Sequence, residues 1–302
     1  MKDEYKKALA RVLVYEGGKV DDPRDPGGRT NQGVTQKVFN TYLASIGKKP
    51  RDVYTMVDAE RDAIYRRRYW DEIAGDTLPP GIGFVVFDGA VNSGVMQSVK
   101  WLQRALGDRY TGKVDGVIGM GTLQAIKTHP DHDKLVAAIC DRRMGFLKSL
   151  KTWARYGKGW SVRVSNVKAT GQAWAMGSVG PEVVWTADPD AQPTAAAHIA
   201  SLAAAKANLE DAKPAPVKAA GDVVGAAGAT ATVAAQGLQQ GLDNAKEQLA
   251  SFTGIAYIEK VLLALTVAGL ALAAGGFAYR YLMAMKSKDR DDALDLAPAG
   301  RV

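Results

Sequence analysis

The apolar positions at the N-terminus of the chain recur with the spacing of an amphipathic helix. Five apolar residues follow one another at i, i+3, i+4, i+7 and i+8, which places their side chains on one helix face. They are Tyr5, Ala8, Leu9, Val12 and Leu13. Glu16 is the next position on this face, and Gly17 and Gly18 follow it as a helix end. The pattern therefore predicts a helix that ends on an inward-facing carboxyl group.

Helical spacing of apolar residues continues to about residue 170, so we expect a mainly α-helical protein. Beyond Trp185 the chain is rich in alanine and has no aromatic residue from Thr186 to Ser251. Such a segment buries little apolar surface, which is typical of a linker that is partly helical and partly flexible.

A second apolar pattern occurs near the C-terminus, where 19 residues from Val261 to Tyr279 carry no charge. At 1.5 Å per residue this stretch is about 28 Å long as a helix, close to the ~30 Å hydrocarbon core of a bilayer. Tyrosines lie at its ends, where interfacial aromatic residues belong. The pattern predicts a transmembrane helix that contacts lipid. A buried core helix is the alternative, but the neighbouring linker offers nothing to bury it.

The charges around this stretch bear on its orientation. Lys260 precedes it, and four cations follow it. The four are Arg280, Lys286, Lys288 and Arg290. The positive-inside rule predicts a cytoplasmic C-terminus with residues 1–256 outside. A helix so near the C-terminus without an export signal is instead typical of a tail anchor facing the other way, so both orientations stay open. Small residues in the stretch allow self-association or pairing with a holin.

Net charge divides the chain at about residue 170. Residues 1–170 contain 29 Lys and Arg against 19 Asp and Glu, a net charge of +10. Residues 171–302 contain 10 against 13, a net charge of −3. The basic part suits an acidic partner such as nucleic acid, anionic lipid or an anionic cell-wall polymer. Nucleic acid is the weakest choice, since the cations are scattered and no binding motif occurs.

Glu16 is a candidate general acid. At the inward face of a helix C-terminus, burial and the negative end of the helix dipole both favour the protonated form of a carboxyl group. A carboxyl group that stays protonated near neutral pH is able to donate a proton in catalysis. The alternative is a frayed helix end at which the glutamate is solvated.

The segment that follows, VDDPRDPGGRTNQGVTQ, mixes polar side chains with glycine and proline. This composition is typical of an irregular functional loop, but also of a plain surface turn. Glycosidases need a second polar partner around the glycosidic bond, a base or a nucleophile. Eight residues separate Glu16 from Asp25, which would lie across a cleft if the loop folds back. Asp22 is the other candidate.

The whole segment YEGGKVDDPRDPGGRTNQGVTQ resembles the signature of glycoside hydrolase family 108, the N-acetylmuramidases of phages and prophages. The resemblance implies a lysozyme-like helical fold and makes Glu16 the catalytic acid. Phage lysozymes more widely show a Glu, eight residues, an Asp and then a Thr. Asp25 matches the second position, and Thr30 lies one residue short of the third, where this chain has Asn31. The catalytic set expected from the resemblance is thus Glu16, Asp25 and Thr30, with Asp22 and Asn31 binding substrate.

Residues from about 84 to 165 resemble the predicted peptidoglycan-binding domain that accompanies this hydrolase. The Asp-Gly-x-Ile-Gly-x-x-Thr-Leu piece from Asp115 to Leu123 is a turn into a helix that recurs in wall-binding modules. We therefore expect a lysozyme-like muramidase domain packed on a helical peptidoglycan-binding domain, then an Ala/Pro/Gly-rich linker, one transmembrane helix and a charged tail. The expected boundaries are 1–83, 84–175, 176–257, 258–284 and 285–302.

Further polar and aromatic residues are candidates for substrate binding. Tyr69 and Trp70 are able to line a sugar cleft, because aromatic rings pack on the apolar faces of pyranoses, although such residues are more often core. Asp88 and Asn92 stand one helical turn apart and would point together into a cleft, or form a structural pair instead.

The sequence indicates no metal or cofactor. His129 and His132, with Asp131 and Asp133, are more typical of a polar turn than of a metal site. One cysteine, Cys140, excludes an intramolecular disulfide framework.

The function expected from these features is hydrolysis of the β-1,4 bond between N-acetylmuramic acid and N-acetylglucosamine, in lysis of a bacterial host cell. The expected partner is peptidoglycan, without nucleic acid. The expected location is the bacterial inner membrane, crossed once, with the catalytic head in the periplasm. Two alternatives remain: a non-catalytic membrane-anchored wall binder, and a holin-like fusion.

Overall fold

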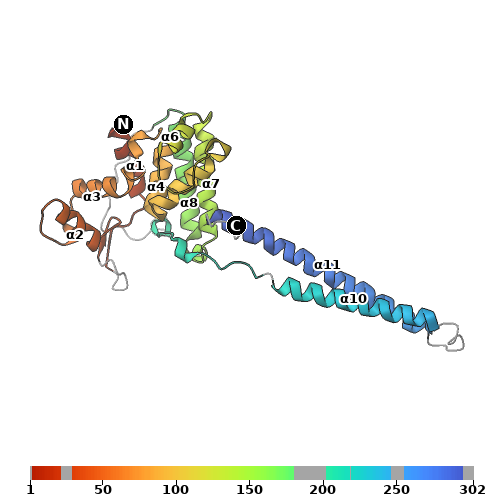
Figure 1. Cartoon of the computed structure of the whole chain (residues 1–302). Coiled ribbons are helices and arrows are strands. Elements are labelled where there is room, and N and C mark those ends of the chain that lie inside the picture. The colour runs from red at the N-terminus through yellow and green to blue at the C-terminus, as the bar shows by residue number, and fades with distance from the viewer. Residues whose placement is uncertain (1, 22–28, 180–201, 218, 246–254, 295–302) are drawn as a thin grey trace. The chain divides into compact units, whose positions relative to one another are not determined.

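The computed structural model describes residues 2–21, 29–179, 202–217, 219–245 and 255–294, which are mainly α-helical (Figure 1). This confirms the fold class predicted from the apolar spacing. The chain divides into two compact units, Met1–Lys213 and Pro214–Val302.

The first unit begins with helix α1 and a small antiparallel sheet. The sheet has the order β1-β2-β3, with Lys19 opposite Asn31 and Thr30 opposite Thr35. Thr35 then caps helix α2, since its hydroxyl accepts the N–H of Val38. The bounds of these elements are α1 Lys2–Leu13, β1 Lys19–Val20, β2 Thr30–Asn31, β3 Val34–Thr35 and α2 Gln36–Ser45.

Short helical segments link this lobe to the centre of the unit. Helix α3 runs directly into a π-helical turn, η2, which carries Trp70 into the core. The segments are η1 Val53–Thr55, α3 Asp58–Tyr65, η2 Arg66–Trp70 and η3 Gly75–Thr77.

The core of the first unit is built around helix α4, Ile82–Ser93, in which every residue from Ile82 to Asn92 is buried. Helices α1, α5, α7 and α8 all contact α4, and Figure 1 shows α4, α7 and α8 side by side. A helix enclosed in this way needs an apolar surface on all sides, which explains the run FVVF in its sequence. The other helices are α5 Val95–Ala105, η4 Gly107–Arg109, α6 Met120–Lys127, α7 His132–Lys148 and α8 Trp153–Ala175.

The described residues of the expected linker, 176–257, include one segment in each unit. Residues 202–213, hereafter the strap, end the first unit, where they pack on its helices and include the 3-10 turn η5 Leu209–Asp211. Helix α10, Ala219–Ala245, belongs to the second unit. The strap is held mainly by hydrogen bonds to its backbone. Its alanine-rich sequence therefore could not indicate that it packs on the helices.

The second unit pairs α10 with α11, Ile255–Ala293, and the two lie side by side in Figure 1. Glycines permit their close approach: a Cβ on Gly228 would lie 2.5 Å from the Ala273 nitrogen and 2.6 Å from the Gly269 oxygen. Arg280 Nη1 lies 3.3 Å from Asp222 Oδ1. Small residues of α11 thus pack against another helix of the same chain.

Helix α11 is longer at both ends than the 258–284 expected from the apolar stretch. In the described part of the chain it is the one helix long and apolar enough to cross a membrane. Its large apolar side chains are mostly exposed, among them Leu263, Leu270 and Phe277.

Candidate active site

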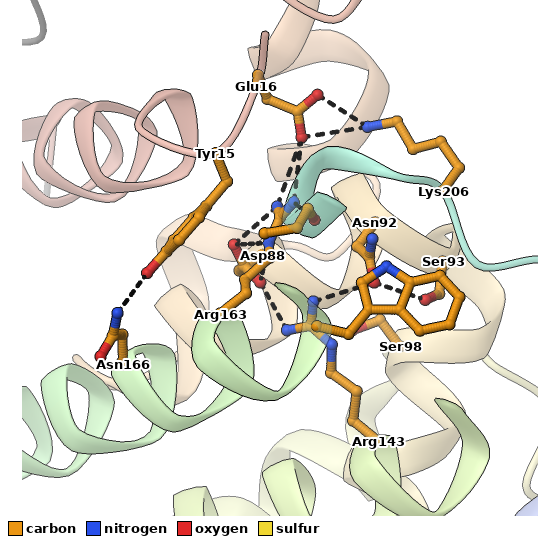
Figure 2. Close-up of polar contacts among 12 residues, drawn as sticks. Tyr15, Glu16, Asp88, Asn92, Ser93, Ser98, Arg143, Arg163, Asn166 and Lys206 are labelled. Carbon is orange, nitrogen blue, oxygen red and sulfur yellow. Dashed lines mark hydrogen bonds and ion pairs between the residues drawn. The ribbon is translucent and has the colours of Figure 1, made fainter. Parts of the chain in front are cut away.

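Glu16 lies in a turn just beyond α1 rather than on its last turn. The helix ends at Leu13, and the N–H groups of Tyr15 and Glu16 donate to the carbonyls of Val12 and Leu13 over 3.0 and 3.2 Å. The turn directs the Glu16 side chain inward, where the residue is only 4% exposed (Figure 2). The predicted burial of Glu16 is therefore present, although the helix stops three residues before it.

Two cations contact the Glu16 carboxylate. Lys206 Nζ lies 3.0 Å from Oε2 and 3.2 Å from Oε1, and Arg163 Nη1 lies 3.4 Å from Oε1 (Figure 2). The Arg163 side chain is completely buried, whereas that of Lys206 is 39% exposed. Glu16 thus sits in an ion-paired site instead of the uncharged surroundings expected at the end of an apolar helix face.

The β2–β3 turn and Tyr65 close the other side of Glu16. Gln32 and Gly33 have φ of 50° and 75°, as in a hairpin turn that requires positive φ at both central residues. A Cβ on Gly33 would lie 2.6 Å from Glu16 Oε2 and would clash with the Tyr65 hydroxyl, so only glycine fits. The Tyr65 hydroxyl donates to the Gln32 carbonyl at 2.9 Å. Burial, and then the charge of Glu16, raises the pKa of Tyr65, which keeps its phenol protonated.

A buried ionic network lies behind Glu16. Arg163 Nε contacts both oxygens of Asp88 at 3.1 and 3.0 Å, and Arg143 Nη1 donates to Asp88 Oδ1 at 2.6 Å (Figure 2). Burial alone would raise the pKa of Asp88, but the charges and hydrogen bonds of Arg163 and Arg143 outweigh it and lower that pKa. Arg163 bridges Asp88 and Glu16, and so fixes the position of the Glu16 carboxylate.

Asp88 and Asn92 therefore come together as the sequence predicted, but as parts of this network. Both are buried, and Arg143 Nη2 donates to Asn92 Oδ1 at 3.2 Å. The Asn92 amide also donates to the Ala205 carbonyl of the strap at 2.8 Å. Arg143 thus joins Asp88 and Asn92, and Asn92 also reaches the strap that covers Glu16.

The other predicted residues differ in their surroundings. Trp70 is completely buried, with its ring 5.4 Å from Phe87 and its Nε1 donating to Asp76, so it is a core residue and cannot line a cleft. Tyr69 is half-buried, and its ring centre lies 5.6 Å from that of Tyr65. Asn31 is buried and donates to the Val53 carbonyl at 3.1 Å.

Thr30 lies in β2, where its backbone pairs with Val20 and Thr35. Asp22 and Asp25 lie outside the described residues.

The sequence reasoning missed Gly33, Tyr65, Arg163 and Lys206. A signal for Arg163 was present, since it falls between Trp160 and Val164 on the buried face of α8, where a charge needs a partner. Lys206 had no such signal, because it stands alone among alanines.

In the described ranges no three metal-ligating side chains gather at one place. The two histidines bond to nearby backbone: Asp131 N–H donates to His129 Nδ1, and His132 Nε2 lies 3.0 Å from the Ile126 carbonyl.

A buried carboxylate beyond the first helix, enclosed by a hairpin and a second helical lobe, is a site of the kind that glycoside hydrolases use. Residues 9–94 match the family described as Glycosyl hydrolase 108, and residues 97–165 match the Predicted Peptidoglycan domain. The solved structure of Brucella abortus SagA is 38% identical in sequence to this chain, and the two structures superpose with a TM-score of 0.50. The match covers 58% of this chain and 97% of the SagA chain. The comparison with curated proteins finds no match.

The chain therefore belongs to glycosyl hydrolase family 108 and carries a peptidoglycan-binding domain. Membership makes it a glycoside hydrolase that acts on peptidoglycan. Glu16 falls within the first match, and Arg143 and Arg163 fall within the second. The strap lies beyond both.

Proposed function

We propose that this protein is an N-acetylmuramidase, which hydrolyses the β-1,4 bond between N-acetylmuramic acid and N-acetylglucosamine. The observation that carries the proposal is the placement of Glu16, a nearly buried glutamate held between the Gly33 turn and Arg163, inside the match to the hydrolase family.

In the proposed reaction Glu16 gives its proton to the oxygen of the leaving sugar. A second carboxylate, Asp25 or Asp22, then stabilises the positive charge on the cleaved sugar or activates water. Thr30 is proposed to assist this second carboxylate. Tyr65 and Gly33 keep the Glu16 carboxyl group in one orientation, which proton transfer requires. This chemistry uses no metal or cofactor.

The bond can be identified from the new chain ends that the enzyme makes. Purified peptidoglycan is digested with the full-length protein in detergent, the products are reduced with borohydride, and their ends are analysed by mass spectrometry. We expect reduced muramic acid. Reduced glucosamine ends would identify a glucosaminidase, and 1,6-anhydro ends a transglycosylase. Sedimentation with peptidoglycan without any release would favour the non-catalytic wall binder.

We further propose that α11 anchors the protein in the bacterial inner membrane with the catalytic head in the periplasm, in the service of host cell lysis. The support is the length and apolar exposed surface of α11. Four cations from Arg280 to Arg290 on its C-terminal side favour the cytoplasm for that end.

This anchor predicts a specific result of alkaline carbonate extraction. The full-length protein should stay in the membrane pellet, because an apolar helix of this length resists extraction. A variant ending at Lys213, the last residue of the first unit, should move to the supernatant with its activity retained. Full-length protein in the supernatant would mean that α11 does not span the bilayer.

Protease added to intact spheroplasts then decides the side of the membrane on which the head lies. Digestion of the head places it outside. Protection of the head places it in the cytoplasm, and a separate pore would have to release it.

A further inference from the structure

The strap makes Glu16 inaccessible to a substrate in this structure. A glycosidic oxygen has to come within hydrogen-bond distance of the carboxyl group that protonates it. Lys206 Nζ instead contacts both carboxylate oxygens, and only 4% of Glu16 is exposed. Of the described residues around Glu16, Arg163 and Tyr65 are part of the buried core, whereas the strap lies at the surface.

The strap binds beside Glu16 through its peptide groups. The Ala203 carbonyl accepts from Arg163 Nη1 at 3.1 Å, and the Ala205 carbonyl accepts from Trp160 Nε1 at 2.8 Å. Asn92 makes two hydrogen bonds with the strap. Its side-chain amide donates to the Ala205 carbonyl, and its backbone carbonyl accepts the Ala207 N–H at 3.0 Å.

Arg163, Trp160 and Asn92 thus bind peptide groups of the strap, beside which methyl groups are buried. Ala203 and Ala207 are completely buried, so their methyl groups fill the space beside the hydrogen bonds. The strap thus presents two carbonyls, one N–H and two methyl groups. The acetamido substituent of an N-acetylated sugar carries the same kinds of group, one of each, so that more than one such substituent would be needed to replace the strap. If the strap left and nothing replaced it, Trp160 Nε1 and the Asn92 amide would lose their acceptor, which buried polar groups tolerate poorly, whereas Arg163 would keep Asp88 and Glu16.

We propose that the strap is a built-in competitor of the glycan, which holds the enzyme inactive until peptidoglycan displaces it. Asn92, Trp160 and Arg163 then bind acetamido groups of the N-acetylated sugars, and Lys206 leaves Glu16 free to act. This inference rests on the proposed function for its effect on activity, but not for the displacement itself.

The strap is also fastened at its far end. The Lys151 N–H donates to the Asp211 carbonyl at 2.8 Å, and the Lys213 N–H donates to the Ser149 carbonyl at 2.9 Å. Displacement near Glu16 therefore leaves the strap tethered at residues 211–213, from which it is able to return.

Gly159 offers a variant that opens the strap without touching the site. A Cβ at this position of α8 would lie 2.5 Å from the Leu202 carbonyl carbon and 2.6 Å from the Leu202 Cβ. Gly159→Ala should therefore loosen the strap, while alanine suits the interior of a helix better than glycine. Lys206→Glu is the second opening variant, because it places a negative charge against Glu16. Lys158→Ala, at an exposed neighbouring position, is the matched control.

The first measurement is muropeptide release by the full-length protein in detergent. If the strap is docked in about nine molecules of ten, opening it raises the apparent activity about tenfold. We expect this rise for Gly159→Ala and Lys206→Glu, and parental activity for Lys158→Ala. Equal activity in the parent and all three variants would overturn the inference.

The second measurement is independent of catalysis. Hydrogen exchange of the Ala207 and Lys213 amides is followed in the full-length Glu16→Gln protein while chitotetraose, an oligomer of N-acetylglucosamine, is added. We expect faster exchange at Ala207, with exchange in α6 unchanged. No change at Ala207 at any concentration would overturn the inference. If no variant releases muropeptides, the proposed function fails, while the exchange at Ala207 still decides whether the glycan displaces the strap.

Discussion

Glu16→Gln is expected to lower muropeptide release by about 10²–10⁴-fold, the range over which general acid catalysis contributes to rate. Glutamine keeps the size of the side chain and its ability to accept a hydrogen bond from Lys206, but it has no proton to give to the leaving oxygen. Arg163 keeps its contacts with Asp88, so the fold should be unchanged.

The matched control is Glu72→Gln, which changes an exposed glutamate of the same lobe and should leave the rate unaltered. Thermal unfolding of both variants shows whether the loss of rate is a loss of fold. An unchanged rate in Glu16→Gln would remove Glu16 from the mechanism. Digestion should be measured in the Gly159→Ala background as well, where the strap does not limit access.

Asp88→Asn should destabilise the first unit by about 3–5 kcal/mol, the usual cost of removing one partner from a buried ion pair. Arg143 and Arg163 are both almost completely buried, and Asp88 is the carboxylate that they share. Without its charge, two guanidinium groups remain out of water with only part of their hydrogen bonds satisfied.

Urea unfolding followed by tryptophan fluorescence measures this effect, because five tryptophans lie in helical segments of the first unit: Trp70, Trp101, Trp153, Trp160 and Trp174. Asp141→Asn is the control: Asp141 is 68% exposed and pairs with Lys168 at the surface, so its loss should cost about 0–1 kcal/mol. A similar midpoint for the two variants would show that the Asp88 network does not stabilise the protein.

The helical character of the chain was predictable, because it follows from periodic apolar positions close together in sequence. The same spacing predicts an inward-facing Glu16, but the burial of Glu16 has another cause. The point at which α1 ends was not predictable either. The apolar spacing continues to Glu16, yet the backbone leaves the helix after Leu13. Contacts with Arg163 and Lys206, 147 and 190 residues away in sequence, bury Glu16, and no local pattern contains them.

Residue type alone could not separate the core role of Trp70 from a role in a cleft. A tryptophan at helical spacing suits both, and only the enclosure by Tyr5 and Phe87 decides the matter. The strap was the least predictable feature. Alanine-rich composition predicts little burial of apolar surface, but recognition of carbonyl and N–H groups needs no apolar side chain.

The Asp88 network also limits how this protein could have been assembled from parts. Asp88 lies in the hydrolase match, while Arg143 and Arg163 lie in the peptidoglycan-binding match that begins three residues after the first one ends. A chain cut between residues 94 and 97 would leave a bare carboxylate in the middle of α4 and expose that helix on the faces covered by α7 and α8. The two sequence modules are therefore one folding unit. If the wall-binding half were exchanged between such enzymes, the incoming half would have to contain both arginines, because Asp88 stays in the hydrolase half. Recombination at this boundary therefore succeeds only between halves whose buried charges match.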